Sequence, residues 1–192
     1  MLRPPTDLER LIQKAQGGDE HAVAALYQRY APMIYRYVAY RVPEFDAEDL
    51  TGEVFVKMVE GLPSYRITEA PFEAWLYRIA AARVADYYRR HKHVTEAKLD
   101  DELPQDDPLP EELLLEQQEL DGLRAALQQL TGEQQSILIW RFVERKSHEE
   151  VAEMLNRSVS AVKTIQHRAL TQLAQILGTR KETRHYLRGR HD

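Results

Sequence analysis

A short segment near the middle of the chain limits the possible folds more than any other feature. Residues 99–110 contain three prolines and five acidic residues among twelve. Proline removes a backbone donor and clashes with the preceding helical turn, and like charges repel, so this segment cannot form a packed helix. It predicts a linker between two domains, with a surface loop inside one domain as the alternative.

The sequences on both sides of this segment favour helices. The 192 residues include only 8 glycines, and they are rich in residues that stabilise helices, such as Ala, Leu, Glu, Gln and Arg. We therefore predict an all-α protein with two helical domains joined by an acidic, proline-containing linker. The expected ranges are 1–98 for the first domain, 99–121 for the linker and the start of the next helix, 122–178 for the second domain, and 179–192 for a disordered basic tail.

Charge is distributed unevenly along the chain, whose formal net charge is -5. Residues 99–121 contain 10 acidic residues and no basic residue, whereas residues 122–192 contain 12 basic and 7 acidic residues. The C-terminal part therefore has the sign that phosphate binding requires, although the whole chain does not.

Composition excludes several classes of protein. The absence of cysteine excludes disulfides and thiolate metal sites, and no apolar run approaches the roughly 20 residues of a membrane helix. The N-terminus lacks the apolar core of a signal peptide, so we expect a cytoplasmic protein without membrane insertion. We expect no cofactor and no enzymatic activity: His148-Glu149 resembles the start of a zinc-protease helix, but Ala152 stands where the second histidine belongs.

Apolar spacing predicts four helices in the first domain. Their expected ranges are Asp7–Gln16, Glu20–Arg41, Ala47–Leu62 and Phe72–His91, with a loop between Pro63 and Pro71. The third helix carries its apolar stripe at Leu50, Val54, Met58 and Leu62, and its acidic residues lie off that stripe.

The second domain begins with a predicted helix over Glu111–Leu130. Thr131, followed three residues later by Gln134, indicates the start of another helix that runs to about Val143. Ser147 is expected to cap a short helix ending at Leu155, and Ser158 a second one, from Val159 to about Leu177, after a turn at Asn156-Arg157.

These last two helices have the pattern of a helix-turn-helix. Val151, Ala152 and Leu155 are expected to meet Val159, Val162 and Ile165 where the helices cross. The second helix then presents short polar and basic side chains that suit the major groove of DNA. They are Ser160, Ala161, Lys163, Thr164, His167 and Arg168. A plain helical hairpin with a solvated basic face is the alternative.

Five pieces of sequence, in order, together resemble the extracytoplasmic-function (ECF) sigma factors of bacterial RNA polymerase. The pieces are Ala15–Glu20, Leu26–Pro32, Asp46–Phe55, Phe72–Ala80 with Asp86 and Arg89-Arg90 downstream, and Leu130–Leu173. The resemblance implies a sigma-2-like domain and a sigma-4-like domain. It also implies that the chain binds RNA polymerase core and promoter DNA, and that an anti-sigma factor is a further partner.

The resemblance also implies roles for individual residues. Binding to the clamp coiled coil of the polymerase is expected of Asp46, Asp49, Glu53 and Phe55. Contact with the melted -10 element is expected of Tyr65, Arg66, Arg83, Tyr88, Arg89, Arg90 and Lys92. Contact with the duplex -35 element is expected of Ser160, Ala161, Lys163, Thr164, Gln166, His167 and Arg168, with Gln166 either reading an adenine edge or simply lying at the surface. Trp75 is expected in the core.

The sequence departs from the family pattern at several positions. Gly52 stands where glutamine is usual, and Ala81-Ala82 replaces a common Arg-Asn pair that faces the -10 strand. Ile165-Gln166 and Leu170 also differ from the usual residues. Two other functions remain open: a free-standing helix-turn-helix regulator that binds duplex operator DNA, and an adaptor that holds polymerase without touching the promoter.

Overall fold

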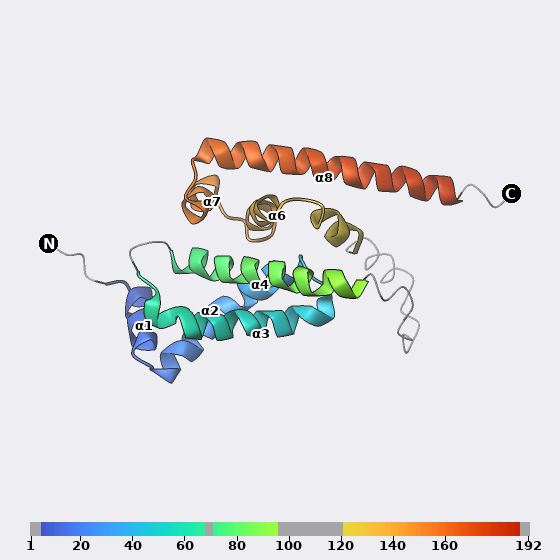
Figure 1. The fold of residues 1–192 in the computed structure, drawn as a ribbon. Coiled ribbons are helices and arrows are strands. Elements are labelled where there is room, and N and C mark those ends of the chain that lie inside the picture. Colours follow the sequence, from blue (N-terminus) through green and yellow to red (C-terminus); the bar gives the residue numbers. More distant parts are fainter. Residues whose placement is uncertain (1–4, 68–70, 96–120, 189–192) are drawn as a thin grey trace. The chain divides into compact units, whose positions relative to one another are not determined.

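The computed structural model describes residues 5–67, 71–95 and 121–188, and the regular structure in these ranges is entirely helical. The chain forms two compact units, one built mainly from α1 to α4 and one mainly from α6 to α8 (Figure 1). The all-α prediction with two helical domains is confirmed, while the predicted linker at 99–110 lies outside the described residues. No helix within the described ranges is long and apolar enough to cross a membrane.

Local capping interactions determine where the first two helices begin. The hydroxyl of Thr6 accepts a hydrogen bond from the Glu9 amide, and the Glu9 carboxylate accepts one from the Thr6 amide, so a capping box starts α1 (Asp7–Gln16). Asp19 accepts a hydrogen bond from the Ala22 amide at 3.0 Å and starts α2 (Glu20–Ala39). The first helix has the predicted bounds, and the second ends two residues early.

The next two helices are longer than predicted. α3 (Glu44–Gly61) begins three residues early, directly after Pro43, with Glu44 and Asp46 in its first turn, where acidic side chains favour the helix dipole. A single turn, η1 (Leu62–Ser64), follows it. α4 (Phe72–Thr95) continues past the predicted end because its basic C-terminal run contains no helix-breaking residue.

The core of the first unit lies along α2, which packs on α1 and α3. α3 and α4 run in opposite directions in Figure 1. Tyr37 of α2 meets Tyr77 of α4 edge to face, with ring centroids 5.0 Å apart. Other side chains buried in this core include Ile12, Leu26, Ile34, Val38, Leu50, Val54, Met58, Leu76 and Ala80.

The second unit contains a helical stretch at 121–127, α6 (Gly132–Leu138), the π-helical turn η2 (Ile139–Val143), α7 (His148–Leu155) and α8 (Val159–Arg188). The predicted capping box at Thr131 is present, because Thr131 and Gln134 exchange both side-chain hydrogen bonds. α8 packs on α6. The predicted helix at Glu111–Leu130 is confirmed over residues 121–127 and ends three residues before Leu130, while residues 111–120 lie outside the described ranges.

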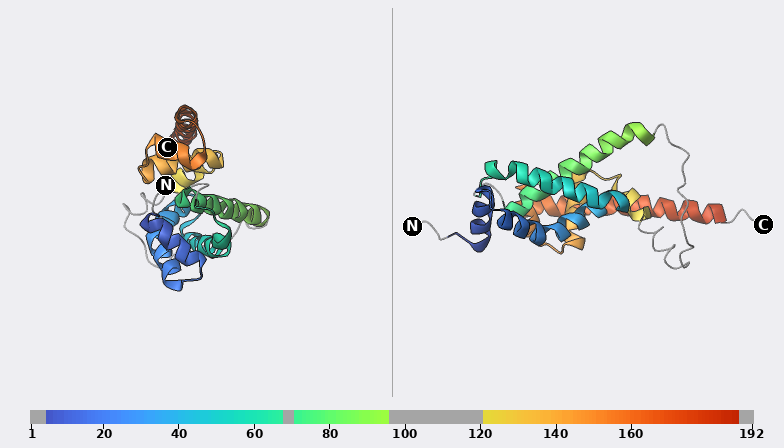
Figure 2. Two further views of the ribbon diagram at one scale, coloured as in Figure 1. Left: turned by 90° about the vertical axis from the view of Figure 1, so that its left-hand side faces the viewer. Right: turned by 90° about the horizontal axis from the view of Figure 1, so that it is seen from below.

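The prediction that α8 ends near Leu177 and is followed by a disordered tail is wrong. The helix continues to Arg188 and extends well beyond α6 and α7 (Figure 2). Gly178 costs about 1 kcal/mol inside a helix relative to alanine. The residues after it, such as Arg180, Lys181 and Glu182, favour helices, and no proline interrupts the segment.

Candidate functional site

Helix α3 has a second apolar face that points away from the core. Phe45 is 81% exposed, Val56 57% and Val59 46%. Together with Asp49 and Gly52 these residues are separated by four, three, four and three positions, so they fall on one side of the helix. We call this set of five residues the α3 face. A soluble helix usually has one apolar side, so a second exposed one indicates a surface that binds a partner.

A shallow hollow lies beside the α3 face. Its volume is about 450 Å³, and its lining includes Tyr27 of α2 together with Gly52, Phe55 and Val56 of α3. A side chain at Gly52 would meet no other atom within 4 Å, so the glycine leaves open space on the exposed side of α3. Phe55 is buried and packs edge to face on Tyr27, with ring centroids 4.8 Å apart. It therefore contributes to the floor of this surface.

Only one of the three acidic residues expected to bind polymerase lies on the α3 face. Asp49 is exposed there. Asp46 is half-buried and accepts a hydrogen bond from the Tyr87 hydroxyl at 2.5 Å, while Glu53 pairs with Arg90 at 3.5 Å. Burial and the bond to Asp46 raise the pKa of Tyr87 well above its usual value. Asp46 and Glu53 thus connect α3 to α4.

The arginines of α4 that were expected to contact the -10 element are engaged within the protein. Asp86 lies between Arg83 and Arg89, with one carboxylate oxygen paired to each and the Arg89 pair at 2.6 Å. Arg90 pairs with Glu53 of α3. The Tyr88 hydroxyl donates to the backbone carbonyl of Arg41, two residues after the end of α2. The side chain of Lys92 lies outside the described residues.

The loop after α3 presents Tyr65 and Arg66 close to an aromatic cluster. The Tyr65 ring lies 4.9 Å from Trp75 and 5.3 Å from Phe72, measured between centroids. Burial raises the pKa of the Tyr65 hydroxyl. Trp75 is half-buried against Phe72, and Arg66 is exposed. Tyr65 is therefore held against the rings of Phe72 and Trp75 at the start of α4.

The helix-turn-helix forms through the predicted local interactions. Ser147 and Glu150 exchange side-chain hydrogen bonds at the start of α7, and hydrogen bonds from the Ser147 amide and hydroxyl lower the pKa of the Glu150 carboxyl. Asn156 adopts a φ of 51°, a left-handed conformation that asparagine tolerates, and this turns the chain between the helices. Ser158 then caps α8 through the Ala161 amide. Val151, Ala152 and Val162 are buried.

The N-terminal part of α8 presents most of the side chains predicted to contact DNA. Ser160, Lys163, Thr164, His167 and Arg168 are exposed, and Ala161 and Gln166 are half-buried. Among the described residues, Lys163, His167 and Arg168 make no ion pair. These side chains are thus available to phosphates or base edges.

Gln166 has an internal partner on the first helix of the helix-turn-helix. Its amide oxygen lies 3.0 Å from the Nε2 atom of His148 at the start of α7. A glutamine that reads adenine needs both its amide oxygen and its amide nitrogen. Gln166 is therefore placed to connect α7 and α8, and it cannot make the bidentate contact while this bond is kept.

Sequence analysis missed Tyr27, Phe45, Val56 and Val59. The interpretation of α3 stopped at its first apolar stripe, which faces the core. The signal was available in the helical spacing of Phe45, Val56 and Val59 on the opposite side, around Asp49 and Gly52.

Two family profiles match the two units of this chain. The profile described as Sigma-70 region 2 matches residues 26–94, and the one described as Sigma-70, region 4 matches residues 126–175. The fold therefore combines, in one chain, the two domains that define a sigma factor. The second match contains the helix-turn-helix.

Similar proteins narrow this class further. The chain is 36% identical to the ECF RNA polymerase sigma factor ShbA of Streptomyces griseus over 180 residues, which cover 88% of this chain and 94% of ShbA. It is 32% identical to the ECF RNA polymerase sigma factor BldN of Streptomyces coelicolor over 183 residues, 91% of this chain and 69% of BldN. The solved structure of CnrH in complex with the cytosolic domain of CnrY shares the fold, with a TM-score of 0.64 and 23% sequence identity. The match covers 90% of this chain and 99% of the chain in that structure. The chain belongs to the ECF RNA polymerase sigma factors.

Proposed function

We propose that this sigma factor docks on RNA polymerase core through the α3 face and the adjoining Tyr27. The observation that carries the proposal is the combination, on one side of α3, of an exposed carboxylate at Asp49 with the exposed side chains of Phe45, Val56 and Val59. Buried apolar side chains supply binding free energy, and a charge at the rim favours a basic partner surface. Such a face fits the clamp coiled coil of the polymerase largest subunit.

The remaining parts of the first unit are proposed to handle the melted -10 element. Tyr65 offers a ring for base stacking and Arg66 a charge for phosphate, and Arg83, Arg89 and Arg90 follow along α4. Since Asp86 and Glu53 hold the α4 arginines, phosphate must compete with those carboxylates. Tyr88 mainly holds α4 against the chain just after α2 through its bond to Arg41.

The second unit is proposed to read the duplex -35 element. The side chains proposed to enter the major groove are Ser160, Lys163, Thr164, His167 and Arg168. Ala161 would lie close to the DNA, and Gln166 would hold α8 against α7 through its bond to His148.

We retain 1–98 and 122–178 as the proposed extents of the two domains. The protein is proposed to work in the cytoplasm, without a catalytic centre of its own, and to be held inactive by an anti-sigma factor. That the similar sigma factor RpoE from Bartonella quintana was solved in complex with the anti-sigma factor NepR supports the last point.

Core binding tests the docking proposal directly. The purified chain is mixed with sigma-free core polymerase, and complex formation is followed by size-exclusion chromatography and titration. We expect Val56→Glu to weaken binding roughly 30-fold or more, because it buries a charge at an apolar contact. Asp49→Ala should weaken it less, by about three- to tenfold.

The matched control is Lys57→Gln, which changes an exposed residue on the next position of α3, off the α3 face, where it pairs with Glu60. This variant should bind core like the unaltered chain. Unchanged core affinity of Val56→Glu would show that the α3 face is not the docking surface. Failure of the unaltered chain to bind core, with tight binding to duplex DNA alone, would favour a free-standing regulator.

A further inference from the structure

The side chain of Gln16 connects the end of α1 to the loop that carries Tyr65. Its Nε2 atom donates a hydrogen bond to the backbone carbonyl of Leu62 at 3.0 Å and another to the carbonyl of Tyr65 at 2.7 Å. These partners lie 46 and 49 residues further along the chain. Both are carbonyl oxygens, so only the nitrogen of the Gln16 amide can face them.

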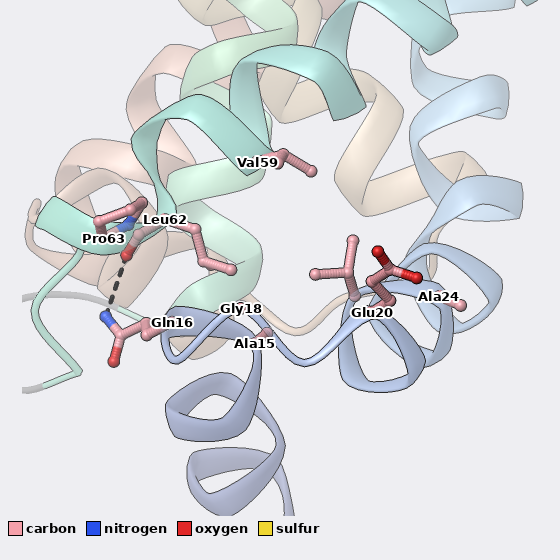
Figure 3. A pocket seen from close by; sticks show the side chains of 9 residues that line it. Ala15, Gln16, Gly18, Glu20, Ala24, Val59, Leu62 and Pro63 are labelled. Atoms are coloured by element: carbon pink, nitrogen blue, oxygen red, sulfur yellow. Dashed lines mark hydrogen bonds between the residues drawn. The ribbon is translucent and has the colours of Figure 1, made fainter.

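The two hydrogen bonds of Gln16 are made where the backbone turns after α3. Leu62 to Ser64 form the turn η1, and Tyr65 leaves it in an extended conformation with φ of -68° and ψ of 131°. The Leu62 carbonyl also accepts the Tyr65 amide at 3.1 Å, so Gln16 occupies its second acceptor position. Figure 3 shows the Gln16 side chain reaching from the end of α1 toward Leu62 and Pro63. The tether therefore fixes the backbone of the residue whose ring meets Trp75.

Gln16 is itself well anchored. Ile12 and Ala15, on the same side of α1, are buried in the core, and Gly17 ends the helix directly after Gln16. α1 also packs on η1. The amide thus extends from a fixed helix end to the loop, and its two bonds are partly buried.

We infer that Gln16 is a positioning residue for single-stranded DNA. It sets the place of the Tyr65 ring, and thereby which base of the melted strand stacks there. This inference rests on the proposed role of the Tyr65 loop. Gln16 touches no DNA itself, so its loss should alter base preference at one position of the strand while core affinity and the helix-turn-helix remain unaffected.

The test uses holoenzyme reconstituted from core polymerase and the full chain. It is incubated with a single-stranded DNA library with ten randomised positions, and the retained strands are sequenced. We expect the unaltered chain to enrich a base at one position, and Gln16→Met, which keeps the size but removes both donors, to reduce this enrichment about fivefold. Gln16→Lys, which restores donors to the same two carbonyls, should recover most of it.

Two further variants separate the possible outcomes. Gln13→Ala changes an exposed residue one turn earlier on α1 and should leave enrichment unchanged. Tyr65→Ala should abolish enrichment at the same position, and adding Gln16→Met to it should have no further effect, because both act through one loop.

Unaltered enrichment by Gln16→Met, together with loss in Tyr65→Ala, would overturn the inference and leave the role of the loop intact. Unaltered enrichment by Tyr65→Ala, or none by the unaltered chain, would overturn both. Equal loss of core affinity and strand enrichment in Gln16→Met would show a merely structural role, which also overturns the inference.

Discussion

The basic side chains near the end of α4, in the first unit, and near the start of α8, in the second, are presented in opposite ways. In the first unit, Arg83 and Arg89 of α4 share the carboxylate of Asp86, and Arg90 pairs with Glu53. In the second unit, the cations near the start of α8 are exposed, and among the described residues they form no ion pair. Similar residue types on two helices thus have different electrostatic states.

The difference fits the nucleic acid that we propose for each surface. A DNA duplex has a regular backbone, so a helix with free cations can dock without rearranging the protein. A melted strand exists only after base pairs open. Arginines that are neutralised by nearby carboxylates have less attraction for duplex phosphates, and we expect them to become available only when a strand competes for them. We therefore expect the second unit to dominate affinity for duplex DNA and the first to respond to single strands.

The largest effect should come from the helix with free cations. Lys163→Ala combined with Arg168→Ala is expected to weaken duplex binding by the holoenzyme roughly 30- to 100-fold and to flatten the dependence of affinity on salt by about two phosphate contacts. The measurement is a salt titration on a duplex selected from a randomised library. Arg124→Gln, which removes a cation paired with Asp121 in the same unit, is the control. A salt dependence equal to that of the unaltered protein would mean that α8 does not meet phosphate.

A smaller effect, of opposite sign, should come from Asp86→Asn. Removal of this carboxylate frees Arg83 and Arg89, so affinity of the holoenzyme for non-specific single-stranded DNA should rise about three- to fivefold at low salt. The gain is modest because exposed ion pairs contribute little in water. Asp121→Asn changes an Arg–Asp pair of the same spacing in the second unit and should leave single-strand affinity unchanged. If both variants gained the same affinity for single-stranded DNA, the gain would reflect net charge alone. The proposed difference between α4 and α8 would then be wrong.

The two units should also lose stability at opposite ends of the pH range. Trp75 reports on the first unit and Trp140 on the second, so single-tryptophan variants follow each by fluorescence. The raised pKa of Tyr87 means that its contribution is fully present below the pKa of the unfolded chain, near 10, and is lost as pH rises toward the folded value. Tyr87→Phe should lower the stability of the first unit by about 1 to 2 kcal/mol at neutral pH and remove this alkaline loss. An alkaline transition that persists unchanged in Tyr87→Phe would contradict the assignment.

The smallest effect is expected at Glu150. Because its pKa is lowered, its contribution is present above the unfolded value, near 4.3, and is lost as pH falls through the folded one. Glu150→Ala should destabilise the second unit by about 0.5 kcal/mol at neutral pH and not at all at strongly acidic pH. Glu149→Ala, at the exposed neighbouring position without the bond to Ser147, is the control. Denaturant titration at several pH values measures the free energy of unfolding of each variant. A loss of stability in Glu150→Ala that does not depend on pH would exclude the carboxylate as its cause.

Most of the helix starts and the division into two units follow from local patterns in the sequence. The caps at Thr6, Asp19, Thr131, Ser147 and Ser158 act through groups within three residues, so their pattern is visible in the chain itself. The helix-turn-helix was predictable for the same reason. Helix ends that depend on the absence of a breaker, as after Gly178 in α8, were predicted less well.

Packing between distant segments sets which of the expected site residues are available to a partner. Asp46 and Glu53 lie on the same helix as Asp49. However, Asp46 accepts a hydrogen bond from Tyr87 and Glu53 pairs with Arg90, and both partners belong to α4, about 40 residues further along the chain. The hydrogen bonds from Gln16 to Leu62 and Tyr65 join residues with a similar separation along the sequence. Helical spacing fixes only the direction in which a side chain points. Whether it meets solvent or a partner depends on how distant segments pack, and a single sequence carries no local signal for that.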